Sequence, residues 1–276
     1  MIQRGQLLCL LLLSIAAQPH FASAQSIELK SGDQALTVDL APFPVSAKLL
    51  WNAGHTTAFE GPLLDDVLKR LPSPRRADTV AIRCSDGWLS LLSLEAVHRA
   101  SGILAVRVRD SGKLNGTLRP LVAPQGPVRL LVGNAALGGK PSPHTESLHA
   151  EIAENGDAWG VVSIELVRRE DFLARTAPAR DASQSVRQGH DFFISHCLHC
   201  HAWKGVGGIS AWDLSDPPLF TYRDEDRVRG YLLDPRKLNP EGHMPSFAKQ
   251  LEGTPLLGHL IEFLKTAGAQ ATPPAR

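Results

Sequence analysis

The sequence predicts two parts of different fold class: residues 25–174 as mixed α+β and mostly β, and residues 185–270 as all-α. In the first part, short runs of alternating or β-branched residues are bounded by Gly, Pro and Asp, as in strands. From Ser185 onward the apolar residues adopt helical spacing. Residues 175–184 mix Ala, Pro and Thr with charged residues and are the expected linker, while 271–276 should be a disordered tail.

The first 24 residues have the pattern of a secretory signal. Arg4 supplies positive charge, Leu7 to Ala17 is apolar, and Ala22-Ser23-Ala24 is an Ala-x-Ala cleavage site. The apolar run is shorter than the roughly 20 residues that span a bilayer. We therefore expect an exported, periplasmic bacterial protein that begins near Gln25 and has no transmembrane segment in its mature chain.

Composition excludes one class of partner. The 276 residues carry a formal net charge of +1 and 21% charged residues. Neither a polybasic footprint for nucleic acid nor an acidic tail is present, so partners must be argued from sites.

The first part is expected to combine short strands with two helices. The strands are Ser26–Leu29, Ala35–Leu40, Thr79–Cys84, Trp88–Leu92, Ile103–Val108, Val128–Val132 and Trp159–Val167. One helix follows Gly61-Pro62 and presents an apolar face of Leu63, Leu64, Val67, Leu68 and Leu71. Ser93–Ala100 is the second.

The strongest motif in the chain is Cys197-Leu198-His199-Cys200-His201. A Cys-x-x-Cys-His run is typical of covalent c-type haem attachment, because thiols three residues apart face one side of a helical turn and add to both vinyl groups of one haem. His201 then provides the proximal iron ligand. Half of a zinc site or a thioredoxin-like redox pair are the alternatives, but zinc would need a second ligand pair.

Helices should surround this motif. Gly189 and Phe193 share a helix face with Cys197, and Leu256–Thr266 carries an apolar stripe after Thr254, a plausible N-cap. Asp224–Leu233 is the expected middle helix.

The sixth iron ligand is assigned to Met244. Met1 leaves with the signal, so Met244 is the single methionine of the mature chain. Proline at 245 fixes the loop beside the ligand and removes an N–H from the pocket. His243 is the main rival for the distal position. His190, His196 and His199 are weaker rivals.

These features resemble a class I cytochrome c. Gly189-His190-Asp191-Phe192-Phe193 is similar to the family's N-terminal helix, and Met244-Pro245-Ser246-Phe247 to its distal loop. Gly205, Gly207 and Gly208, followed by Asp213-Leu214, resemble its glycine loop, although Trp212 stands where proline is usual. The resemblance implies one covalent haem c, one-electron transfer and a redox protein partner.

The first part resembles the sulfite-oxidase-type molybdopterin-binding domain over Ser26 to Leu173. The similar stretches are Phe59 to Leu68, Val80 to Leu92 around Asp86-Gly87-Trp88, and Gly126 to Val132. The resemblance makes Cys84 a possible molybdenum ligand. A buried strand cysteine is the favoured interpretation, because Val80 and Ile82 alternate with it, and molybdopterin is therefore not favoured.

Three functions follow as hypotheses, with no catalytic residue assigned. The first is an exported monohaem electron carrier whose N-terminal part docks a redox partner. The second is a molybdenum-dependent oxidoreductase of sulfite-dehydrogenase type with its cytochrome c acceptor fused on one chain. The third is a haem-based sensor with a displaceable distal ligand.

Overall fold

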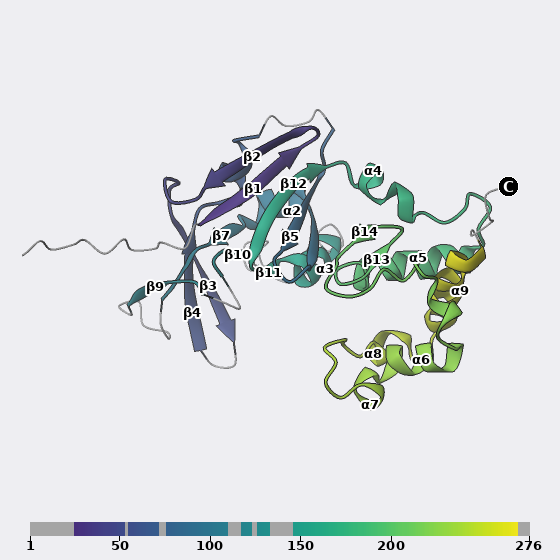
Figure 1. Ribbon diagram of the computed structural model, residues 1–276. Helices are drawn as coiled ribbons and strands as arrows, with labels where there is room; N and C mark the ends of the chain where they lie inside the picture. Colours follow the sequence, from purple (N-terminus) through teal and green to yellow (C-terminus); the bar gives the residue numbers. More distant parts are fainter. Residues whose placement is uncertain are drawn as a thin grey trace, which may run out of the picture.

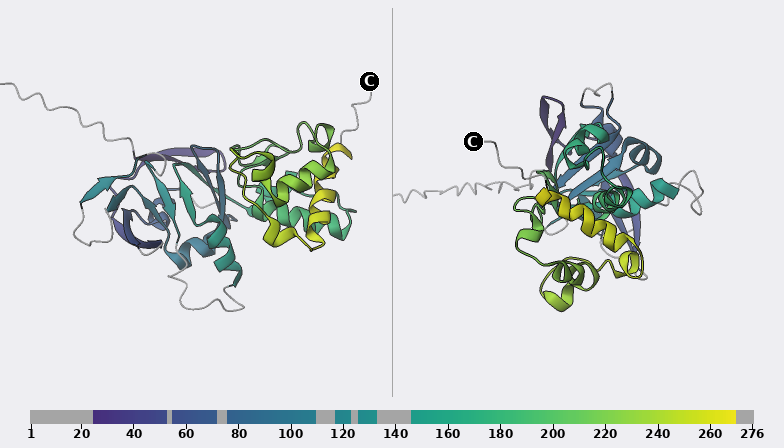
Figure 2. Two further views of the ribbon diagram at one scale, coloured as in Figure 1. Left: turned by 90° about the horizontal axis from the view of Figure 1, so that it is seen from below. Right: turned by 90° about the vertical axis from the view of Figure 1, so that its right-hand side faces the viewer.

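The computed structural model describes residues 25–52, 55–71, 76–109, 117–122, 126–132 and 146–269. The expected signal peptide, residues 1–24, and the expected tail, residues 271–276, lie outside them. A β-rich N-terminal part and a C-terminal part lie side by side (Figures 1 and 2).

The largest sheet of the described residues has five strands in the order β2-β1-β12-β5-β6. They are β1 (Ser26–Ser31), β2 (Gln34–Asp39), β5 (Thr79–Cys84), β6 (Leu89–Ser93) and β12 (Val161–Val167). β1 and β12 pair in parallel, whereas the other pairs are antiparallel. All but Arg83 of β5 is buried, as expected of a strand covered on both faces.

Two further sheets belong to the N-terminal part. One has the order β11-β10-β7, formed by β7 (Ile103–Ala105), β10 (Arg129–Leu131) and β11 (Asp157–Trp159). The other has the order β3-β4-β8-β9, formed by β3 (Ser46–Asn52), β4 (His55–Gly61), β8 (Arg107–Arg109) and β9 (Leu118–Pro120). The expected strand Ile103–Val108 is therefore divided at Val106 between two sheets.

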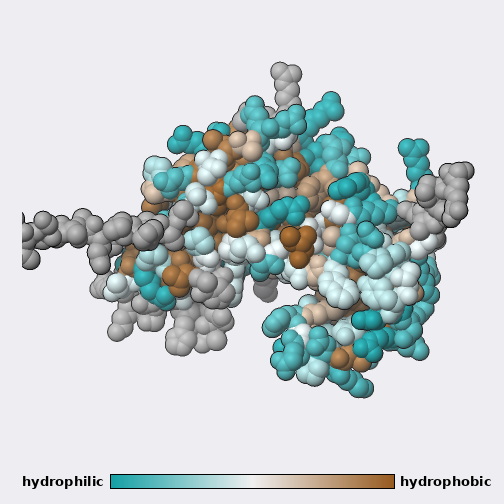
Figure 3. Space-filling model, in the orientation of Figure 1, coloured by the Kyte–Doolittle hydropathy of each residue, from teal (hydrophilic) through white to brown (hydrophobic). Residues whose placement is uncertain are grey.

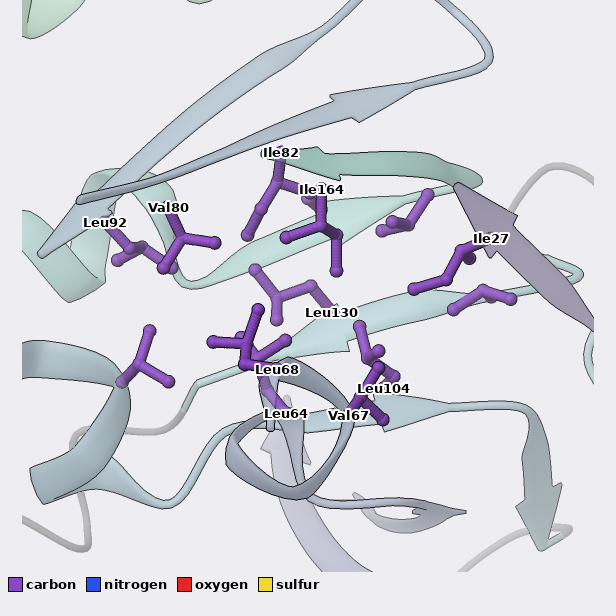
Figure 4. Packing of buried hydrophobic residues seen from close by; sticks show 14 of the residues in the cluster. Ile27, Leu64, Val67, Leu68, Val80, Ile82, Leu92, Leu104, Leu130 and Ile164 are labelled. Carbon is purple, nitrogen blue, oxygen red and sulfur yellow. The ribbon is translucent and has the colours of Figure 1, made fainter. Parts of the chain in front are cut away.

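Three helices of the described N-terminal residues lie beside the sheets: α1 (Leu64–Leu68), α2 (Leu94–Ala100) and α3 (Glu146–Asn155). A fourth, α4 (Arg169–Leu173), packs against the buried cluster that contains Phe193 and Phe263. Ser93 begins α2, because its side chain accepts a hydrogen bond from the backbone N–H of Ala96. The core lies where α1 meets the sheets: Figure 4 shows its leucines pointing toward Ile82 and Ile164 on one side and Leu104 nearby.

The C-terminal part begins with α5 (Gln184–His196) and ends with α9 (Leu256–Ala269). Between them lie β13 (Ala202–Trp203), β14 (Val206–Gly207), α6 (Glu225–Leu233), α7 (Pro235–Leu238) and α8 (Ala248–Leu251), with a 3₁₀ turn at Leu219–Thr221. A second 3₁₀ turn, Ala174–Thr176, precedes α5. Helices α5 and α9 cross closely. A Cβ at Gly189 would lie 2.1 Å from the carbonyl oxygen of His259, so only glycine allows this approach.

The expected fold class, a mostly β sulfite-oxidase-like part followed by an all-α class I cytochrome c part, is wrong. The chain is mixed α/β, and its helices are distributed along both parts. The C-terminal part also contains a β hairpin, in which Ala202 pairs with Gly207.

The physical reason is a shared core. Ala81, Leu89 and Leu91 of strands β5 and β6 belong to the same buried cluster as Phe193, Trp203 and Phe263. The C-terminal helices thus complete their apolar core with side chains from the five-stranded sheet and do not form a self-contained helical unit.

One further expectation was the absence of a membrane span. Among the residues that the structure describes, no helix combines the length and apolar character needed to cross a bilayer. Apolar surface is most visible over the β-rich part, and the surface is hollowed between this part and the region of α7 and α8 (Figure 3).

Candidate functional site

The Cys-x-x-Cys-His segment, residues 197–201, forms the turn that follows α5. Cys197 is the C-cap of the helix, and its carbonyl accepts hydrogen bonds from the backbone N–H groups of Cys200 at 3.2 Å and His201 at 2.9 Å. The segment therefore continues helically for one turn. As expected from the spacing, both cysteines reach one cavity.

Two cavities adjoin this segment. The cysteine-side cavity, of about 620 Å³, is lined by Cys197, Cys200, His201 and Met244, by neighbours of these residues, and by two other stretches, 86–88 and 210–211. The tyrosine-side cavity, of about 440 Å³, is lined by Tyr222, Tyr231, Leu232 and others. His201, Ser210, Ala211 and Met244 line both cavities. Each volume lies in the range of small-molecule and cofactor sites.

The imidazole of His201 is held in one orientation. Its Nδ1 lies 2.9 Å from the carbonyl oxygen of Trp212, and because a carbonyl only accepts, Nδ1 must donate. Burial lowers the pKa of His201, although the bond to Trp212 opposes this shift. The ring is thus kept neutral with an unprotonated Nε2, the form of histidine that binds metals.

The carbonyl that orients His201 belongs to Trp212, the residue at which the sequence departs from the cytochrome c pattern that it resembles. Trp212 takes the place where proline is usual, and its backbone carbonyl orients His201. Its indole is 67% exposed and lies 6.2 Å from the ring of Tyr222. A backbone acceptor is available from any residue, so the departure from proline does not remove the function.

Met244 reaches the cavities from a loop that is fastened to α6. The backbone N–H of Phe247 donates to the carbonyl of Leu232 at 2.9 Å, and the Ser246 hydroxyl donates to the carbonyl of Leu233. Phe247 is itself buried and packs edge-on against Phe192 of α5 at 5.9 Å. These contacts fix the loop on the C-terminal side of the methionine.

The rival histidines are differently engaged. His199 is 5% exposed, and its two ring nitrogens face the carbonyls of Leu89 and Ser195. His190 contacts the hydroxyl of Thr176 at 3.0 Å, while the ring of His196 packs against Phe192. His196, His199 and His243 all line the cysteine-side cavity, and His243 is the exposed one of the three, so it stays the main rival for the distal position.

The N-terminal part contributes directly to this site through its edge strand β6. Leu89 donates its N–H to the carbonyl of His199 and accepts from Nδ1 of the same residue, both at 2.9 Å. Farther along the edge, Leu91 and Ser93 donate to side chains of Asn155 and Glu151 on α3. The segment of residues 197–201 therefore covers one end of this sheet edge, and α3 covers the other.

The turn between β5 and β6 reaches the cysteine-side cavity as well. Asp86 and Trp88 line it, and the indole of Trp88 stacks on the ring of His199 at 4.9 Å with 12° between the planes. The carbonyl of Gly87 accepts the N–H of Ile209 at 2.8 Å. Nothing local in the sequence indicated this contact, because it joins segments 110 residues apart.

Cys84 has a different environment. It is 5% exposed within the core of the N-terminal part, alongside Val80, Ile82 and Val161, so the burial expected of it is confirmed. Burial, with a smaller contribution from the Asp86 carboxylate, raises the pKa of its thiol to about 12. A thiolate, the form that binds metals, is strongly disfavoured there.

The surroundings of Cys84 do not fit a molybdenum cofactor. The residue lines neither of the two cavities described above. The turn beside it, at residues 85–88, is covered by the backbone of Ile209 and Ser210.

The cysteine-side cavity brings together two thiols, the imidazole of His201 and the thioether of Met244. Within the described residues, no group of three or more His, Cys, Asp and Glu side chains is placed to hold a metal ion.

No protein-family model matches the chain, and no curated protein matches its sequence.

Proposed function

We propose that this protein is an exported, periplasmic monohaem c-type cytochrome that transfers single electrons to or from a redox protein partner. The observation that carries the proposal is that Cys197, Cys200, His201 and Met244 line one cavity. The methionine comes from a segment more than 40 residues farther along the chain than the other three. Such a convergence of thiol, imidazole and thioether groups matches haem c with His/Met ligation.

Each residue has a role in this proposal. Cys197 and Cys200 form the thioether bonds, His201 is the proximal ligand through Nε2, and Met244 is the distal ligand. The carbonyl of Trp212 keeps the His201 ring in the required tautomer. When bound, the haem supplies an iron centre that is reversibly oxidised by one electron.

The pocket chemistry supports electron transfer over ligand sensing. The loop of Met244 is fastened to α6 on its C-terminal side and packs on Phe192, which opposes displacement of the methionine. An iron with two held protein ligands exchanges electrons without binding substrate. The alternative, a molybdenum oxidoreductase, depends on Cys84, whose buried protonated thiol offers it no support.

The test is haem retention. Protein produced in a host with a c-type haem maturation system should keep its haem after acid-acetone extraction and contain about one iron per chain. The double variant Cys197→Ala/Cys200→Ala should lose the covalent haem completely, whereas Cys84→Ala should keep it. Extractable haem in the wild-type protein, or molybdenum near one per chain that is lost in Cys84→Ala, would overturn the proposal.

A further inference from the structure

The turn of residues 86–88 carries an inference that rests on the proposed function and deepens it. We propose that this turn of the N-terminal part is a component of the haem site, in which Trp88 acts as a positioning residue that holds the attachment segment and keeps water from its cysteine side. The N-terminal part then sets the reduction potential of the iron.

The first argument is placement. Asp86 and Trp88 line the same cavity as both attachment cysteines and Met244. The turn therefore lies at the cavity wall on the side of the cysteines.

The second argument is that the turn is built rigidly. Asp86 accepts the backbone N–H of Trp88 at 2.9 Å, and Gly87 donates to the carbonyl of Cys84 at 3.0 Å. Gly87 has φ +88°, a conformation that L side chains rarely adopt. The turn of residues 86–88 therefore has a fixed conformation where it meets residues 209–210.

The third argument is the closeness of the contact. A Cβ at Gly87 would lie 2.6 Å from the backbone nitrogen of Ser210 and 2.7 Å from the carbonyl carbon of Ile209. Only a glycine lets the two backbones approach to this extent. Such an approach leaves no room for water between the turn and residues 209–210.

The fourth argument is how Trp88 fixes His199. The Trp88 ring is held in place by a bond from Nε1 to the hydroxyl of Ser90 at 3.1 Å, and it stacks on the imidazole of His199. His199 lies between the two attachment cysteines in sequence and bonds to Leu89. Trp88 therefore acts on the haem site through the segment itself.

The consequence is a shift in the equilibrium between the oxidised and the reduced haem. The oxidised haem carries one more positive charge than the reduced haem, and water stabilises that charge better than an apolar wall does. A site shielded from solvent has the higher reduction potential, because the surrounding dielectric and solvent access tune the metal. Removal of the indole should admit water and favour the oxidised form.

The test compares three variants of the haem-loaded full chain by potentiometric titration. Trp88→Leu should shift the oxidation equilibrium about tenfold toward Fe(III), which corresponds to about 59 mV for a one-electron couple. Trp88→Phe keeps a stacking ring and should restore most of the wild-type potential. Trp159→Leu, an exposed tryptophan of β11 that stacks on Arg129, should leave the potential unchanged.

Two readouts separate the possible failures. The methionine-to-iron charge-transfer band should persist in Trp88→Leu, showing that the shift does not come from a lost ligand. An unchanged potential in a folded, haem-loaded Trp88→Leu would overturn this inference and leave the proposed function intact. A wild-type protein without covalent haem would instead overturn the proposed function.

Discussion

Cys84 and Cys200 lie near the same carboxylate, that of Asp86, and yet their surroundings give them different chemistry. Cys84 belongs to strand β5, with its thiol packed among apolar side chains. Cys200 lies on the turn after α5, is only partly buried and lines a cavity of about 620 Å³. Asp86 contributes to the raised pKa of both thiols.

The difference shows what a cofactor site requires beyond a reactive residue type. Around Cys200 the chain provides space, a second thiol, an oriented imidazole and a thioether from another segment. Around Cys84 it provides close packing, which stabilises the fold and excludes a ligand. The surroundings of Cys84 thus belong to the core, whereas those of Cys200 form the cavity in which we propose that the haem binds.

Substitution of Met244 has the largest expected effect, because in the proposed function its thioether is the second protein ligand of the iron. Met244→Ala should abolish the methionine-to-iron charge-transfer band of the oxidised protein. The reduction potential should fall on the order of 0.1 V or more, within the roughly 0.8 V that axial ligands span. Absorption spectra and redox titration provide both measurements.

Glu241→Ala is the matched control for this variant. It changes an exposed residue of the same loop that lines neither cavity, so the band should remain. A wild-type spectrum that lacks the band would contradict the assignment of the distal ligand. A bis-imidazole spectrum that is lost on substitution of His243 would contradict it as well.

The reactivity of the thiols toward an alkylating reagent tests whether Cys84 is buried and protonated in the native protein. A pKa of about 12 in place of 9.0 lowers the thiolate fraction of Cys84 at pH 8 about a thousandfold. Because burial raises this pKa, the thiolate should form in the folded protein only as the pH approaches 12. Iodoacetamide at pH 8 should therefore modify no residue of the native haem-loaded mature protein and one residue in denaturant.

Mass spectrometry of the alkylated peptides identifies that residue. We expect carboxamidomethylation at Cys84 alone, since thioether bonds protect Cys197 and Cys200. Rapid modification of Cys84 in the native state would show that its core is open to solvent. Modification of the other two would show that they carry no haem.

Local patterns allowed the sequence to predict several elements. Strand β5 has the expected bounds, Ser93 begins α2, and α6 follows Asp224 as its N-cap. Each depends on residues within one turn or one strand, where propensity and capping decide the outcome. The two-residue strands β13 and β14 leave no comparable pattern and escaped prediction.

The fold class was wrong for a non-local reason. Periodicity after Ser185 indicates helices, but it does not reveal that Leu89 and Leu91 of a distant strand complete their core. The same applies to the site. The motif residues could be read from spacing, whereas the stacking of Trp88 on His199 and the carbonyl of Trp212 depend on tertiary placement.

The smallest expected effect concerns the crossing that supports the attachment turn. Gly189→Ala places a Cβ 2.1 Å from the carbonyl oxygen of His259, so α5 and α9 must separate. We expect a loss of about 1–3 kcal/mol in the free energy of unfolding, as for other overpacked contacts. Urea unfolding of the haem-loaded protein measures it.

Gly258→Ala is the control in the partner helix. A Cβ at this position meets no atom within 4 Å, and alanine favours helix over glycine by up to about 1 kcal/mol, so this variant should be neutral or more stable. Equal destabilisation by both substitutions would mean that the contact between residue 189 and the carbonyl of His259 is not the cause of the lost stability. Because α5 ends at the attachment turn, a separated crossing should also move Cys197 relative to Met244. Gly189→Ala alone should therefore weaken the charge-transfer band, which links the packing of the helices to the ligation of the iron.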